Sequence, residues 1–105
     1  MDQNLMKTRR LELDKFFQDL CPHVYYQPPE TLKMQYPAIR YRRTAIDVQA
    51  ADNLPYVIDV AYEVTVIDKD PDSSIVFELS KLPKCRMVRH YTADNLNHDT
   101  FIIYP

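Results

Sequence analysis

The sequence predicts an α+β fold, in which an antiparallel sheet with a long β-hairpin carries two helices on one face. Three patterns predict this class. Apolar residues recur at helical spacing near the N-terminus, apolar and polar residues alternate over a long central stretch, and a proline-marked helix start precedes two more alternating stretches. The 105 residues, 46% of them hydrophobic, suit a single domain over residues 1–105 with one modest core.

The first helix is expected over residues 4–20, because apolar side chains fall on one side at helical spacing and Pro22 ends the pattern. These apolar residues are Met6, Leu13, Phe16, Phe17 and Leu20. Packing of this stripe on the sheet is the favoured interpretation, and a partner-binding stripe at Phe16 and Phe17 is the alternative.

A short strand is expected over residues 23–27, stopped by Pro28 and Pro29. Residues 39–67 follow as an extended antiparallel hairpin. In its second strand every even position from Tyr56 to Val66 is apolar, while polar residues stand at several odd positions, as in a long half-buried strand. The turn signal Asp52-Asn53 marks the tip, and residues 42–54 are expected to form a projecting arm.

The second helix is expected over residues 71–82, with Asp70 as its N-cap and Pro71 at its first position. Its buried stripe contains Ile75, Leu79 and Leu82, and Pro83 stops it. Two strands are then expected, over residues 85–91 and 100–104, on either side of a polar turn at 93–99.

Composition excludes several classes of function. The chain contains no glycine, which rules out glycine-dependent phosphate loops and dinucleotide fingerprints, so no cofactor is expected. Two cysteines cannot form a disulfide scaffold, and no run resembles a signal peptide or a membrane span, so we expect a soluble, reduced protein. A net charge of −2 argues against nucleic-acid binding through overall charge.

The aspartates at 68, 70 and 72 have the spacing of a calcium loop, but the required glycine and bidentate glutamate are replaced by Ser73 and Leu79. Helix capping is the favoured interpretation of these acids. A transition-metal site would draw on Cys85, His90, His98 and Asp99. No pair has metal-site spacing, and we expect Cys85 and His90 on opposite faces of one strand.

No catalytic residue is predicted, since neither Cys21 nor Cys85 has the context of a cysteine–histidine nucleophile pair. His98 and Asp99 are expected to make local bonds to the backbone that shape the hairpin.

The densest basic cluster consists of Arg40, Arg42 and Arg43. A solvated face or an ion pair between subunits is favoured over phosphate contacts to nucleic acid. Residues 56–83 are rich in acids, and a chain with separate basic and acidic regions suits head-to-tail contacts between its copies. The three arginines, together with Ile46 and Val48 of the arm, are the candidate interface residues.

Four segments of the chain resemble the small neck and tail-completion proteins of long-tailed bacteriophages, the tail terminators above all. They are Tyr36–Tyr41 (YPAIRY), Tyr62–Ile67 (YEVTVI), Asp70–Ser73 (DPDS) and Asp94–Asp99 (DNLNHD). The resemblance lies in the order of the elements and in similar short sequence segments, and it covers most of the chain.

The resemblance implies a tail-terminator-like α+β subunit of the virion, assembled in the host cytoplasm as a hexameric ring on the last ring of the tail tube. Its partners would be copies of itself, the tail tube protein and a head-completion or connector protein. DNA would pass through the lumen as cargo, and no membrane is involved. The family has no catalytic residues to carry over.

Three alternatives stay open. The first is a head-completion or connector protein, which is also a small ring-forming adaptor. The second is a metal-dependent nuclease that uses Asp68, Asp70 and His98. The third is a DNA-binding module that uses the arginine cluster, which would give binding a steep salt dependence.

Overall fold

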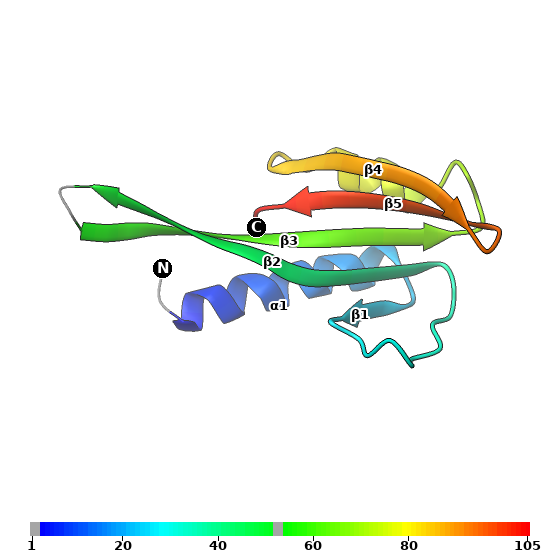
Figure 1. Cartoon of the computed structure of the whole chain (residues 1–105), viewed down its shortest axis with the longest axis horizontal. Coiled ribbons are helices and arrows are strands. Elements are labelled where there is room, and N and C mark those ends of the chain that lie inside the picture. The colour runs from blue at the N-terminus through cyan, green and yellow to red at the C-terminus, as the bar shows by residue number, and fades with distance from the viewer. Residues whose placement is uncertain (1–2, 52–53) are drawn as a thin grey trace.

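The computed structural model describes residues 3–51 and 54–105, and within 47–51 and 54–59 it describes the backbone alone. The fold is α+β, as predicted, and one helix precedes the long hairpin in the chain while the other follows it (Figure 1). The elements in chain order are α1 (Gln3–Leu20), β1 (Val24–Tyr26), β2 (Ala38–Ala51), β3 (Leu54–Asp68), α2 (Ser74–Ser80), β4 (Cys85–Ala93) and β5 (Leu96–Ile103). None of the described helices is long and apolar enough to span a membrane.

The strands form one sheet in the order β1-β2-β3-β5-β4. The sheet is mostly antiparallel, but β1 pairs with β2 in parallel, which the sequence analysis did not predict. A parallel neighbour needs a connection that returns the chain to the same end, and the loop between Gln27 and Pro37 provides it. In Figure 1, β5 lies between β3 and β4, so β4 is an edge strand.

The core lies between one face of the sheet, here called the helix face, and the two helices. Phe17 of α1 packs edge-on against Tyr41 of β2 at 5.1 Å between ring centroids. Leu79 of α2 is buried in the same cluster as Val64 and Phe101, which are opposite each other in register. One core therefore holds both helices to the sheet. The other face, here called the open face, has no helix of the described chain packed against it.

The alternation predicted for β3 is confirmed on the helix face, where Val60, Tyr62, Val64 and Val66 are buried. The expected exposure of the polar face is wrong at Thr65, which is buried, as is the apolar Ile67 on the same face. The reason is position in the sheet. This half of β3 pairs with β2 on one side and β5 on the other, so it is a central strand of the sheet with neighbours on both sides.

The distal half of the hairpin pairs with no third strand among the described residues. The β2–β3 register runs from Ala38↔Ile67 to Ala51↔Leu54, whereas β5 pairs with β3 only from Tyr62 onward. The arm was predicted over residues 42–54, but Arg42 and Arg43 pair with Glu63 and Tyr62, which also pair with β5. We therefore call the two-stranded part, residues 45–51 and 54–61, the arm. The arm makes the molecule elongated, with extents of 51 × 23 × 23 Å. In Figure 1 it projects beyond the rest of the sheet.

The second helix is shorter than predicted. It covers Ser74–Ser80 rather than residues 71–82, and its N-cap is Ser73, so the assignment of Asp70 as N-cap is wrong. Asp70 instead accepts a hydrogen bond from the Asp72 amide at 2.9 Å, and Asp68 accepts one from the Asp70 amide at 3.0 Å. These local turns compete with helix formation and delay the helix start to Ser74.

The last hairpin is tighter than predicted. The turn consists of Asp94 and Asn95 alone, with φ of 54° and 63°, so β5 begins at Leu96 rather than near residue 100. Positive φ at both central residues is typical of a type I′ turn, in which Asn and Asp are the residues that best replace glycine.

Candidate functional site

The basic cluster predicted from the sequence is divided between the two faces of the sheet. Arg40 and Arg42 stand opposite Thr65 and Glu63 in register, and therefore lie on the open face. Arg43 stands opposite Tyr62, whose side chain is buried against the helices, and so lies on the helix face. Successive strand residues point to opposite faces, so Arg43 is directed away from Arg40 and Arg42, although all three residues border one depression at this edge of the sheet.

Arg42 forms an ion pair within its own chain. Its guanidinium lies 3.3 Å from Oε2 of Glu63, its cross-strand partner. The pair is largely exposed, and such pairs contribute about 1 kcal/mol or less. The sequence analysis favoured a solvated face or an ion pair between subunits, whereas Arg42 forms its ion pair within its own chain.

A depression of about 440 Å³ lies on the open face beside this pair. Gln27 and Pro28 of the β1–β2 loop form one wall, and Arg40, Glu63 and Thr65 line the sheet side. The lining is mostly polar and carries both signs of charge, so its chemistry does not define a small-molecule site.

Arg43 borders a second depression of about 310 Å³ on the helix face, together with Lys7 and Arg10 of α1. The guanidinium of Arg10 lies 4.4 Å from the centroid of the Tyr26 ring. Burial raises the pKa of Tyr62 in this wall, and the charges of Arg10 and Arg43 partly oppose the rise. The lining contains three cations and no carboxylate.

Of the two arm residues predicted for an interface, Ile46 is described in full and is 47% exposed. Its cross-strand partner Val60 is buried, so the boundary between the buried core and the exposed arm lies at this pair. The backbone of Val48 pairs with that of Ile58, but its side chain lies outside the described residues.

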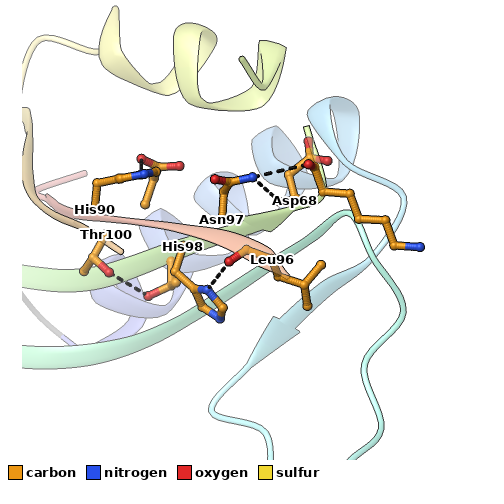
Figure 2. A network of polar contacts seen from close by, with 9 residues as sticks. Asp68, His90, Leu96, Asn97, His98 and Thr100 are labelled. Carbon is orange, nitrogen blue, oxygen red and sulfur yellow. Dashed lines mark hydrogen bonds and ion pairs between the residues drawn. The ribbon is translucent and has the colours of Figure 1, made fainter. Parts of the chain in front are cut away.

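The histidines considered for metal binding each form a separate polar contact (Figure 2). His90 Nδ1 lies 2.6 Å from Oδ1 of Asp99, while His98 Nδ1 lies 3.2 Å from the carbonyl oxygen of Leu96. Figure 2 shows His90 and His98 on opposite sides of β5. The local backbone contact predicted for His98 is confirmed, whereas Asp99 bonds to a side chain.

The prediction that Cys85 and His90 lie on opposite faces is wrong. A β-bulge between Met87 and Arg89 inserts one residue, which restores His90 to the face of Cys85. Cys85 pairs in register with Ile103 and His90 with Asp99, both of them on the helix face. Even so, no group of three potential ligands in the described residues could hold a metal ion.

Neither thiol is set up as a nucleophile. Burial raises the pKa of Cys21 and of Cys85, which keeps both protonated at neutral pH. The Cys21 thiol donates to the carbonyl oxygens of His23 and Pro37, both at 3.4 Å, as a buried structural cysteine does.

The segment that matched a calcium loop is held by local hydrogen bonds, including bonds to its backbone. Asn97 closes the same segment, because its side-chain nitrogen donates to the carbonyl oxygens of Asp68 and Lys69, both at 3.3 Å (Figure 2). This contact anchors the end of β3 to β5 and shapes the connection to α2.

The surface that sequence reasoning missed is the edge strand β4. Its residues from Arg86 to His90 are all exposed, including Met87 at 47% and Val88 at 46%. The absence of acids between Glu78 and Asp94 was a visible signal in the sequence. The edge position of β4 was not visible, because it follows from the insertion of β5 between β3 and β4.

Comparisons with protein-family models, curated proteins and solved structures found no match to this chain.

Proposed function

We propose that this chain is a structural protein of a long-tailed bacteriophage virion, a tail terminator that assembles as a hexameric ring and caps the tail tube at the head–tail connection. The proposal combines the resemblance of four sequence segments with one observation of the fold, the two-stranded arm. Its partners are further copies of the chain, the tail tube protein and a head-completion protein, with DNA as passing cargo.

The arm carries the proposal because it is unsupported within the subunit. Outside Tyr62–Asp68, β3 has only β2 as a described neighbour. An isolated two-stranded ribbon is marginally stable in water at best. Contacts with another chain supply the missing stabilisation, and a ring supplies such contacts to every subunit alike.

The exposed apolar residues point in the same direction. Phe77 on α2 is 62% exposed, and Met87 and Val88 on β4 are about half exposed. Aromatic residues and Met are enriched in the buried centres of protein interfaces. A subunit with contact surfaces on its arm and on its opposite edge fits an adaptor that meets several neighbours.

Capping of tail tubes tests the proposed function. Purified protein is mixed with tail tubes of the encoding virus that lack their terminator, and the ends are imaged by negative stain. We expect a ring at one end of each tube. A protein that forms no rings alone and leaves the tubes uncapped contradicts the proposal. Rings that bind the portal-side connector but not the tube would assign the head-completion role instead.

A further inference from the structure

The arm is acidic and lacks any basic residue. From residue 45 to residue 61 the sequence contains three acids, Asp47, Asp52 and Asp59, and no lysine or arginine. The register places Asp47 directly opposite Asp59. Like charges at opposite positions of antiparallel strands destabilise their pairing. A cationic neighbour would relieve this repulsion.

The edge strand β4 has the complementary character. Lys84, Arg86 and Arg89 stand in a stretch without acids, and no ion pair joins Arg86 or Arg89 to an acid in the described residues. The guanidinium of Arg89 rests 4.8 Å from the centroid of the Tyr91 ring, which holds it at the surface of this edge.

Both elements also present free backbone edges. Strand β4 pairs with β5 on one side and with no described strand on the other. In the arm, residues 45–51 of β2 have a free outer edge without proline, whereas β3 carries Pro55. Long unpaired edges add strands from other chains unless they are blocked by proline, by charge or by bulges. The bulge next to Val88 leaves Arg89–Ala93 as the uninterrupted stretch of this edge.

Within one subunit the two elements do not meet. Figure 1 shows the arm projecting past one end of the sheet, while β4 lies along the far edge, beyond β3 and β5. The partner that brings an acidic arm to a basic edge is therefore a second copy of the same chain.

We propose that the arm of one subunit adds to the outer edge of β4 in the next subunit along Arg89–Ala93, with its acids near Arg86 and Arg89 and with Ile46 near Met87 and Val88 beside the bulge. This inference rests on the proposed ring and names the contact that closes it. The contact is heterologous, so each subunit gives one arm and receives another, and the series closes where the rotation per subunit permits. Backbone pairing supplies affinity and the charges set the register.

Charge reversal with rescue tests the contact. One variant carries Arg86→Glu and Arg89→Glu, and a second carries Asp47→Lys and Asp59→Lys. Analytical ultracentrifugation at the highest attainable concentration measures their self-association. We expect the wild type to form closed oligomers and each variant to associate at least about tenfold more weakly. The chain with all four substitutions should recover association, because the charges again oppose each other.

The matched control for the arginine variant is Lys15→Glu with Lys33→Glu. It makes the same change in net charge at two exposed positions, one on α1 and one in the loop before β2. We expect it to associate like the wild type, and circular dichroism melting should show every variant folded. Any of three results overturns the inference. The wild type stays monomeric, a charge-reversal variant associates as strongly as the wild type, or the chain with all four substitutions does not regain association.

The inference and the proposed function fail separately. Tail tubes capped normally by the Arg86→Glu, Arg89→Glu variant would overturn the arm contact and leave the terminator function intact. A wild type that assembles through this contact, with rescue, but ignores tail tubes would support the contact and overturn the terminator function.

Discussion

Tyr41 joins the first helix to the sheet through both its ring and its hydroxyl group. The ring is fully buried and lies 5.1 Å from that of Phe17 and 4.7 Å from that of Tyr26, between centroids. The hydroxyl donates to a carboxylate oxygen of Asp14 on α1. A buried hydroxyl needs such a partner, and an ionised acceptor makes the bond stronger than a neutral one.

Replacing Tyr41 with Phe keeps the ring and removes the hydrogen bond. We expect a loss of about 2 kcal/mol in the free energy of unfolding, the usual contribution of a bond to a charged group. Urea denaturation measures it. Tyr25→Phe is a matched control, because its hydroxyl only accepts a bond from the Gln35 amide at an exposed site. An equal loss in both variants would show that the Asp14 contact has no special role.

The same residue predicts a dependence on alkaline pH. Burial, followed by the bond to Asp14, raises the pKa of Tyr41 above its ordinary value near 10. Above that value the unfolded chain loses the proton while the folded chain keeps it. The stabilisation is therefore complete below about pH 10 and declines as pH rises further. We expect Tyr41→Phe to show a shallower alkaline decline in melting temperature, and an unchanged slope would contradict this assignment.

The N-terminus of α2 differs from the prediction, in which Asp70 was the N-cap. Ser73 occupies the N-cap of α2 without a side-chain capping bond, and its hydroxyl is buried without a partner among the described residues. Asp70 instead bonds the Asp72 amide. The sequence identifies both as capping types, but only the backbone conformation decides which of two competing local bonds forms.

Ser73→Ala should accordingly keep or slightly raise stability, although loss of a working N-cap typically costs about 1 kcal/mol. Removing a buried hydroxyl without a partner removes its desolvation cost. Asp70→Ala should cost about 0.5–1 kcal/mol through loss of the turn bond. Thermal melting of both variants, with and without calcium, checks this. A calcium-dependent rise in melting temperature that Asp70→Ala abolishes would restore the metal hypothesis.

At the scale of elements, the turn between β4 and β5 shows how a chain without glycine builds a tight hairpin. Asp94 and Asn95 both adopt positive φ, a region in which bulky β-branched residues are strained. The sequence predicted a turn here because Asn and Asp are turn residues. It placed the ends of the strands wrongly, because a two-residue turn lets pairing continue to Ala93 and Leu96.

The turn gives a prediction with its own internal control. Asn95→Gly should hold or raise stability, since glycine adopts positive φ without strain. Asn95→Val should lower the free energy of unfolding by about 1–3 kcal/mol, the usual cost of a strained backbone position. Urea denaturation of the two variants measures the difference. Equal stabilities would mean that the hairpin is held by its strands rather than by this turn.

The β4 bulge illustrates what an alternating pattern cannot reveal. Counting by twos from Cys85 puts His90 on the opposite face, and one extra residue beside Val88 reverses the result. The separation of Arg43 from Arg40 and Arg42, by contrast, follows from the same period of two and was available from the sequence. Pattern reasoning was thus sufficient for continuous strands and failed at an irregularity that no local residue signals.

At the scale of the whole molecule, the fold class and the long hairpin follow from the sequence, but the order of the strands does not. The position of β5 beside β3 depends on contacts distant in sequence, such as Val64 with Phe101. That placement turns β4 into an edge and leaves Met87 and Val88 exposed. The surface with the clearest contact chemistry therefore appears only when the chain is folded.

The arm gives the final prediction, which concerns its apolar residues rather than its charges. Ile46 is 47% exposed although it pairs with buried Val60, and Val48 follows two positions along the same strand. Since no third strand among the described residues pairs with the arm, folding of the subunit core does not depend on these side chains, whereas contact with a neighbour does. Replacing both with Ser should keep the monomer folded, with an unchanged melting temperature by circular dichroism, and should block assembly in ultracentrifugation. Leu5→Ser with Leu11→Ser, at two exposed positions of α1, controls for the loss of surface apolar area. If the Ile46→Ser, Val48→Ser chain unfolds, these residues belong to the core of their own subunit, and if it assembles normally, the arm makes its contacts without them.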